Sequence, residues 1–246
     1  MEKINYKSST LKLVDDLSEI SKTRDGYSSI KFTKDLEGIH VRSRNESKTI
    51  MFTLDAPSDN LSIGSELCIY NYSEFYKYLT TIGTPDIYFG IVNEGTDTET
   101  EAIVLQKGNR KVTYPVSDSE VIAGHFTKLR EQEISTSFKF TSENLQQFKK
   151  VLSLIQSKST KIRMVFSGKV AKVFIFSEDS NNTYEDSFDL LSEVEEEFTM
   201  VIQKDFFKYL INTNYDVQVS DVGGYLKFAF DLEDNKCAVV VTSDDE

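Results

Sequence analysis

The sequence predicts an α+β protein made of two similar halves, each built from antiparallel sheets with two short helices on one face. Three observations lead to this prediction: an internal repeat of about half the chain, helical apolar periodicity, and apolar–polar alternation in strand-length runs. The 246 residues are enough for one large domain or for two of about 120 residues. The repeat favours two.

The repeat is clearest in two six-residue segments. Residues 74–79 read Glu-Phe-Tyr-Lys-Tyr-Leu, and residues 205–210 read Asp-Phe-Phe-Lys-Tyr-Leu. Each segment follows a short apolar run of strand type, residues 67–70 in the first half and residues 198–202 in the second. The chain therefore looks like two copies of one design.

Helical periodicity predicts how each copy opens. Apolar residues recur at a spacing of three over residues 8–22, and a second apolar stripe runs through residues 142–156. Thr141 or Ser142 can cap the amino end of that second helix. With helices also beginning near residues 73 and 204, each half is predicted to hold two units of a helix followed by strands.

Alternating apolar and polar residues predict the strands between these helices. In the first half the pattern covers residues 29–32, 39–42, 49–54, 87–92, 102–106 and 111–116. In the second half it covers residues 161–166, 170–176, 184–190, 217–220, 225–231 and 238–242. Turn sequences separate several of these runs, at Lys107-Gly108-Asn109, Ser167-Gly168-Lys169, Val222-Gly223-Gly224 and Asp234-Asn235. Residues 93–101 and the acidic run 193–197 are predicted to be loops.

The domain boundaries follow from a break in this pattern. Residues 117–135 continue neither strand nor helix, so we predict a first domain of residues 1–116, a connecting loop of residues 117–135 and a second domain of residues 136–246. Val121, Ile122 and Phe126 indicate that the loop lies on the protein surface.

Composition excludes several classes of protein. The chain is 39% hydrophobic with 17 Phe and 12 Tyr, too apolar for a disordered acidic protein. No apolar stretch reaches the roughly 18 to 20 residues that span a bilayer, and the residues after Met1 lack a signal-peptide pattern, so we expect a cytoplasmic protein without a membrane partner. Cys68 and Cys237 lie apart in apolar runs and are expected to be small core residues.

Enzymatic chemistry is not indicated. His40 lies in a strand pattern and His125 in the connecting loop, and neither has a serine, cysteine or metal-ligand partner at a recognisable spacing. The sequence has no Gly-rich phosphate loop, nucleophile elbow or zinc signature. We therefore expect no catalysis, no metal and no cofactor.

The lysines of the helices point to a different function. The formal net charge of −12 argues against nucleic acid unless positive charges gather on one face. Lys149 and Lys150 share the polar face of the helix over residues 142–156, and Lys77 and Lys208 hold equivalent positions in the repeat. Any single lysine is also explained as a solvent-facing helix residue, but recurrence at matched positions favours a basic surface.

Together these features resemble the DNA polymerase sliding clamps, a group that includes the PCNA-like clamps, and most closely the clamps of tailed bacteriophages. The resemblance covers essentially the whole chain. It rests on the two-fold repeat with four short helices, the stretch Thr141-Ser142-Glu143-Asn144-Leu145-Gln146-Gln147, the connecting loop after Tyr114-Pro115, and the final strand and polar tail of residues 237–246. It implies the DNA-clamp fold, with sheets outside and two helices per domain inside, assembled as a homotrimeric ring around double-stranded DNA.

The resemblance also implies the sites and partners. The residues facing DNA would be Lys12, Lys77, Lys149, Lys150, Lys204 and Lys208, with Lys22 and Lys158 as further candidates. The subunit interface would join the strand around residues 110–116 to the strand around residues 183–190 of the next chain, through Lys111, Val112, Tyr114, Tyr184 and Phe188. Tails of the replicative polymerase and the clamp loader would dock in a pocket lined by Ile39, Val41, Val121, Ile122 and Val239, although core packing is the better explanation for any one of these residues.

Two alternatives stay open at this point. The first is a monomeric or dimeric viral processivity factor of the same fold, which holds DNA on an open basic face. The second is a β-rich structural protein with no DNA partner, whose lysines would be scattered over both faces. In a viral setting, the protein would act in the host cytoplasm.

Overall fold

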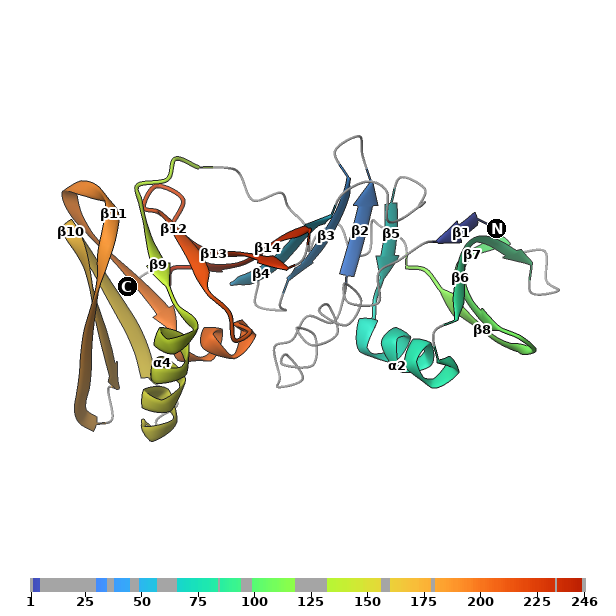
Figure 1. Cartoon of the computed structure of the whole chain (residues 1–246), viewed down its shortest axis with the longest axis horizontal. Coiled ribbons are helices and arrows are strands. Elements are labelled where there is room, and N and C mark those ends of the chain that lie inside the picture. The colour runs from blue at the N-terminus through green and yellow to red at the C-terminus, as the bar shows by residue number, and fades with distance from the viewer. Residues whose placement is uncertain are drawn as a thin grey trace. The chain divides into compact units, whose positions relative to one another are not determined.

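The computed structural model describes most of the chain, and the elements are labelled in Figure 1. The described residues are 2–4, 30–34, 38–44, 49–56, 66–83, 85–93, 99–117, 132–155, 160–177, 180–232 and 234–244. Two compact units divide the chain. Unit 1 comprises Met1–Lys48, Phe52–Thr127 and Glu233–Lys236, and unit 2 comprises Thr49–Met51, Lys128–Leu232 and Cys237–Glu246. The predicted boundaries at residues 116 and 136 stay a prediction.

Unit 1 is dominated by antiparallel strands. One group has the order β1-β6-β7-β8, formed by β1 (Glu2–Ile4), β6 (Asp86–Asn93), β7 (Glu99–Lys107) and β8 (Arg110–Pro115). The other has the order β4-β3-β2-β5, formed by β4 (Ile50–Ala56), β3 (Ile39–Arg44), β2 (Ile30–Lys34) and β5 (Glu66–Ile69). In the second group one face is apolar, because buried Phe32, Val41 and Phe52 alternate with half-buried polar neighbours.

Helix α2 (Tyr72–Ile82) follows β5 and packs by one apolar stripe. The Asn71 side chain accepts a hydrogen bond from the Glu74 amide at 3.2 Å, and Gly83, with φ of 74°, ends the helix in the left-handed conformation that glycine adopts without strain. Tyr72 and Phe75 lie among the buried residues of the stripe. The predicted helix near residue 73 is therefore confirmed.

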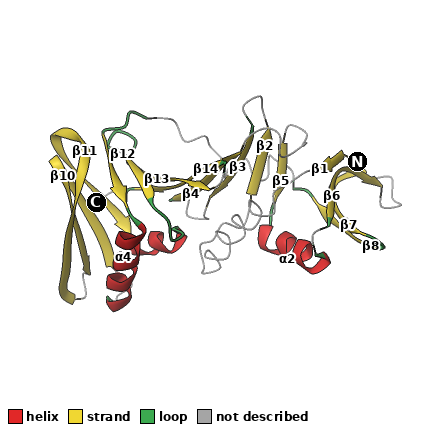
Figure 2. Cartoon of the chain, in the orientation of Figure 1, coloured by secondary structure: helices red, strands yellow, loops and turns green. Residues whose placement is uncertain are grey.

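Unit 2 has the strand order β10-β11-β9-β12-β13-β14 and contains helix α4 and the short 3-10 helix η2 (Figure 2). In chain order its elements are β9 (Thr136–Phe140), α4 (Ser142–Leu154), β10 (Thr160–Ser177), β11 (Ser180–Gln203), η2 (Lys204–Tyr209), β12 (Tyr215–Ser220), β13 (Tyr225–Leu232) and β14 (Asn235–Thr242). The predicted helix over residues 142–156 is confirmed to within two residues.

Aromatic side chains form the core of unit 2. Phe148 of α4 stacks on Phe207 of η2 at 5.4 Å between ring centroids, and Phe140 of β9 meets Phe148 edge to face at 5.5 Å. Phe188 of β11 and Phe228 of β13 complete the cluster around Phe140, at 5.6 and 5.8 Å. Tilted and edge-to-face pairs of this kind add to the free energy of burying the rings. The cluster joins α4 and η2 to the sheet.

Strand β10 is strongly bent. Its two halves pair with different parts of β11, residues 161–166 with 198–203 and residues 170–176 with 183–189. The guanidinium of Arg163 lies 5.1 Å from the ring centroid of Phe176, although a straight strand would place these residues about 40 Å apart. The chain therefore reverses near Gly168, whose φ is 57°. The turn predicted at this glycine marks that reversal.

Other predictions need correction. The helix near residue 204 is only a six-residue 3-10 helix, and the acidic run 193–197 lies in strand β11 instead of a loop. The loop predicted over residues 93–101 was too long, because β6 extends to Asn93 and β7 begins at Glu99. Strands β1 and β9 were missed. The helix predicted over residues 8–22 lies outside the described residues. None of the helices in the described ranges is long and apolar enough to cross a bilayer.

Candidate nucleic-acid interface

Helix α2 presents one of the predicted lysines. Lys77 is exposed, and within the described part of the chain its ammonium takes part in no hydrogen bond or ion pair. The same face carries exposed Glu74 and Thr80, and the Thr80 hydroxyl donates to the carbonyl of Tyr76 at 3.0 Å. Unit 1 therefore offers a single positive charge on this helix.

Helix α4 carries a polar face, as the periodicity predicts. Gln146, Lys149, Lys150 and Ser153 are all exposed. The Lys149 ammonium donates a hydrogen bond to the carbonyl of Leu210 at 2.8 Å, and desolvation by burial lowers the pKa of Lys149. The Lys150 ammonium has no hydrogen-bond or ion-pair partner among the residues that the structure describes. Two adjacent lysines thus have different surroundings.

The lysines of η2 also differ from each other. The Lys204 ammonium lies 3.5 Å from the carbonyl of Ile155, the residue that ends α4. Lys208 forms an ion pair with Asp205 at 2.7 Å, and both side chains are about half exposed to solvent. An exposed pair of this kind contributes little to stability, so Lys208 can exchange Asp205 for another anion.

Unit 2 therefore brings four predicted lysines onto one pair of neighbouring helices. They are Lys149, Lys150, Lys204 and Lys208. Lys77 belongs to unit 1. Lys12, Lys22 and Lys158 lie outside the described residues. Helical periodicity identified the polar face of α4, but the bonds from Lys149 and Lys204 to main-chain carbonyls of another element were not predicted.

The residues predicted for a subunit interface fall into two groups. Lys111 is exposed and Val112 is half-buried, on β8, which pairs only with β7 in the described sheet order. Tyr114 of the same strand is buried, its hydroxyl donates to the Asn71 carbonyl at 2.9 Å, and burial raises its pKa. Lys111 and Val112 are thus available to a partner, whereas Tyr114 holds unit 1 together.

The same division applies on β11. Tyr184 is half-buried, accepts a hydrogen bond from the Gln147 amide at 2.8 Å and donates one to Asp186 at 3.1 Å. Burial, followed by the negative charge of Asp186, raises the pKa of Tyr184. Phe188 is buried in the aromatic core of unit 2 and offers no surface to a partner.

Two of the residues predicted to line a partner pocket are buried in the structure. Val41 and Val239 each have 0% exposed surface, so both are core residues, the alternative that the sequence left open. Val121, Ile122 and the side chain of Ile39 lie outside the described residues. The half-buried side chains of β3 are those that alternate with Val41.

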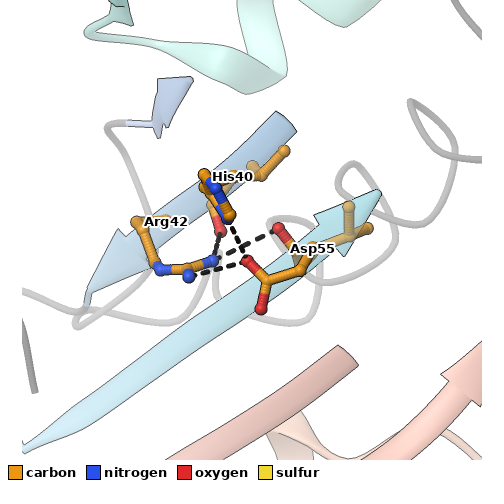
Figure 3. Close-up of polar contacts among 5 residues, drawn as sticks. His40, Arg42 and Asp55 are labelled. Atoms are coloured by element: carbon orange, nitrogen blue, oxygen red, sulfur yellow. Dashed lines mark hydrogen bonds and ion pairs between the residues drawn. The ribbon is translucent and has the colours of Figure 1, made fainter. Parts of the chain in front are cut away.

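These alternate side chains form a polar cluster between β3 and β4 (Figure 3). His40 Nδ1 lies 2.7 Å from Asp55 Oδ1, and Arg42 Nη2 lies 2.7 Å from the same oxygen. Arg42 Nη1 also donates to the carbonyls of Val41 and Leu54, at 3.0 and 3.2 Å. The cluster links two neighbouring strands. Sequence spacing did not reveal the pairing, because His40 and Asp55 lie on different strands.

Over the described residues, no group of three or more His, Cys, Asp and Glu side chains is arranged to hold a metal ion.

Comparison with known proteins gives a result at the level of structure. No protein-family model and no curated protein matches the chain in sequence. A structure of A. fulgidus PCNA with the C-terminal region of FEN-1 bound has a TM-score of 0.70 and 12% identity, over 100% of this chain and 99% of that chain. PCNA from Thermococcus kodakaraensis has a TM-score of 0.64 and 12% identity, over 98% of this chain and 99% of that chain. The chain therefore has the fold of the PCNA sliding clamps.

Proposed function

We propose that the chain is a sliding clamp, a DNA polymerase processivity factor that encircles duplex DNA and tethers the replicative polymerase. The observation that carries this proposal is similarity to PCNA structures along the whole chain, with a TM-score of 0.70. Exposed lysines on α2, α4 and η2 support it. By the resemblance of its sequence, the clamp is of the tailed-bacteriophage type.

The charge of the chain fits topological binding. A clamp is held on DNA because the ring is closed, so it needs only weak contacts with phosphates, independent of base sequence. A net charge of −12 with a few lysines on the helices provides weak attraction at the helices and repulsion elsewhere. Catalysis then belongs to the tethered polymerase, and this chain acts as a scaffold.

Two strand segments support a homotrimer: β8, which pairs only with β7 in the described sheet order, and residues 183–189 of β11, whose described pairs are all with β10. We place the joint between β8 of one chain and residues 183–190 of β11 in the next. Arg110 and Lys111 are exposed on β8, whereas Glu185 and Asp189 are exposed on β11, so opposite charges meet in this pairing. Pairing would also remove an edge that otherwise favours aggregation.

Partner proteins are the second part of the proposal. The A. fulgidus PCNA structure has the C-terminal region of FEN-1 bound. By analogy we propose that the tails of the polymerase and the clamp loader dock on this chain. The walls of that site are not Val41 or Val239, because both side chains are fully buried.

Absolute mass by light scattering across a dilution series tests the ring. A mass near 84 kDa, three times the chain mass of 28.1 kDa, is expected. A dimer or a monomer at every concentration contradicts the trimer and favours the processivity factor that binds on an open face.

Encirclement itself is tested with DNA ends. A linear duplex is prepared with free ends or with streptavidin on biotinylated ends, and the chain is loaded before the ends are blocked. A ring stays on the blocked duplex at high salt and slides off the free one. Equal loss from both, increasing with salt, identifies direct adhesion and contradicts encirclement.

A further inference from the structure

Each helix that the structure describes ends at a carbonyl that a lysine of another element reaches. The carbonyl groups of the last turn of a helix have no partner within the helix and carry partial negative charge. Neither α2 nor α4 has a basic residue in its last turn. Instead, lysines from other elements reach the residues that end α2, α4 and η2.

The three contacts are specific. Lys107 of β7 donates to the carbonyl of Gly83, which ends α2. Lys149 of α4 donates to the carbonyl of Leu210, which ends η2. Lys204 of η2 reaches the carbonyl of Ile155, which ends α4. The contacts between α4 and η2 are therefore reciprocal.

Further bonds fix the same pair of segments. The side-chain amide of Gln146 donates to Asn212 at 3.2 Å, and the Ser142 main-chain amide donates to the Asn214 side chain at 2.9 Å. The rings of Phe148 and Phe207 stack beneath them. Lys149 is one member of a continuous set of contacts that holds the segment after β11 against α4.

Helix geometry separates Lys149 from Lys150. Consecutive residues of an α-helix point about 100° apart, so the two side chains leave the helix in different directions. The Lys149 ammonium donates a hydrogen bond to the carbonyl that ends η2, whereas the Lys150 ammonium has no hydrogen-bond or ion-pair partner within the described ranges. A partial negative charge beside an ammonium also reduces its attraction for a phosphate.

We propose that Lys149 and Lys204 are positioning residues that lock η2 to α4, and that contacts with DNA phosphates in this part of unit 2 fall to Lys150 and Lys208. The second half of the proposal rests on the proposed function, because it assumes that DNA lies against these helices. The first half does not. Lys208 is available to a phosphate because, among the described residues, the only ion pair of its ammonium is the exposed one with Asp205.

Amine labelling of the intact protein tests both halves. The probe is an N-hydroxysuccinimide ester of acetic acid, with tandem mass spectrometry to assign each lysine, in the absence and presence of end-blocked duplex DNA. Without DNA, reactivity is compared as the rate constant of the neutral amine, obtained from a pH series, because the lowered pKa of Lys149 by itself speeds its labelling. This rate constant is expected to be several-fold lower for Lys149 than for Lys150, because the Lys149 nitrogen is held at the Leu210 carbonyl. With DNA, Lys150 and Lys208 become protected, and the reactivity of Lys149 and Lys204 is unchanged.

The outcomes separate the proposal from the proposed function. Equal reactivity of Lys149 and Lys150 without DNA overturns the positioning role. Protection of Lys149 by DNA to the same extent as Lys150 overturns the division of roles. If DNA protects no lysine, the proposed function fails, while slow labelling of Lys149 without DNA still supports the lock.

A matched pair of variants provides a second readout. Lys149→Gln and Lys150→Gln remove the same charge from neighbouring positions of one helix. Lys150→Gln is expected to reduce the slope of log association constant against log salt by about 0.9 for each phosphate contact removed, up to three contacts in the proposed trimer, with unchanged thermal unfolding. Lys149→Gln is expected to leave that slope unchanged and to increase amide exchange in residues 204–210. Lys149→Arg restores protection, because a guanidinium also donates to the Leu210 carbonyl.

A lower salt slope for Lys149→Gln with unchanged exchange in residues 204–210 assigns Lys149 to DNA and overturns the proposal.

Discussion

Tyr215 shows how one side chain makes the stability of unit 2 depend on pH. Its ring is buried and meets Phe228 and Phe230 edge to face, at 5.8 and 5.3 Å. Its hydroxyl donates to the Ile211 carbonyl at 2.7 Å. Burial raises the pKa of Tyr215 well above its ordinary value of 10. The folded state therefore retains a proton that the unfolded state releases.

This difference predicts loss of stability in alkali. A folded pKa above the unfolded pKa gives stability that is complete below about pH 10 and is lost as the pH rises beyond it. Urea unfolding from pH 8 to pH 11 is expected to show a falling free energy of unfolding. In Tyr215→Phe the free energy is about 1 kcal/mol lower at pH 8, because one hydrogen bond is missing, and it falls less steeply with pH. Parallel curves for the two proteins would show that folding does not raise the pKa of Tyr215.

Single residues also show where the sequence was informative. Strand alternation places Val41 on one face of β3 and His40 on the other, and the structure agrees. The alternation did not reveal that Asp55 of β4 pairs with His40. The bond from Lys149 to Leu210 was not, because helical periodicity gives the face of a residue but not the carbonyl that another element places beside it. A lysine whose ammonium bonds to the end of another helix can have the same sequence neighbours as a lysine that faces solvent.

At the scale of elements, α4 owes its start to a capping box. The Thr141 hydroxyl accepts from the Asn144 amide at 3.2 Å, and the Asn144 side chain accepts from the Thr141 amide at 2.9 Å. The sequence left Thr141 and Ser142 as alternative caps, and the structure assigns the role to Thr141. The Ser142 amide bonds instead to Asn214.

This assignment gives a matched comparison. Thr141→Ala is expected to lower the free energy of unfolding by about 1 kcal/mol, because the Asn144 amide in the first turn loses the hydroxyl that accepts its hydrogen bond. Ser142→Ala, one residue later, is expected to change it by less than about 0.5 kcal/mol, because the bond to Asn214 uses the main chain. Chemical denaturation of both variants measures the difference. An equal loss of stability in the two variants would show that Thr141 is not the cap.

The two copies of the repeat show the limit of local sequence. Glu-Phe-Tyr-Lys-Tyr-Leu at residues 74–79 lies within an 11-residue α-helix, whereas the matching residues from 205 lie in a six-residue 3-10 helix. The second copy begins directly after β11 and has no side-chain cap, and β12 starts at Tyr215. The short connection between two strands limits the helix, which the six residues themselves do not reveal.

At the scale of the molecule, the fold was predictable because it rests on repetition and periodicity. Two copies with matched helices and strands indicated a clamp, and the similarity to PCNA at 12% identity confirms that fold. The burial of the side chains that were predicted to contact partners was harder to predict from the sequence. Burial of Phe188 and Val239 depends on packing between strands far apart in sequence, which alternation within one strand does not determine.

A charge reversal tests the proposed assembly. Lys111→Glu places a negative charge opposite Glu185 and Asp189 of the next chain, so the trimer is expected to dissociate and the mass to fall from about 84 to about 28 kDa. Lys150→Glu makes the same change of charge on α4, outside the proposed joint, and is expected to keep the larger mass. Light scattering measures both. A Lys111→Glu protein that keeps the mass of the parent would exclude β8 from the joint.

Tyr114 connects two parts of unit 1 that the proposed function uses for different purposes. It lies on β8, and its hydroxyl holds the carbonyl of Asn71, the residue that caps α2, while its ring contacts Phe75 edge to face at 5.4 Å. A force that pulls β8 outward, as the opening of a ring at this strand would, acts directly on the first turn of α2. That helix carries Lys77. In the proposed ring, opening the joint at β8 would therefore tilt the helix that carries Lys77, because the Tyr114 side chain connects the two.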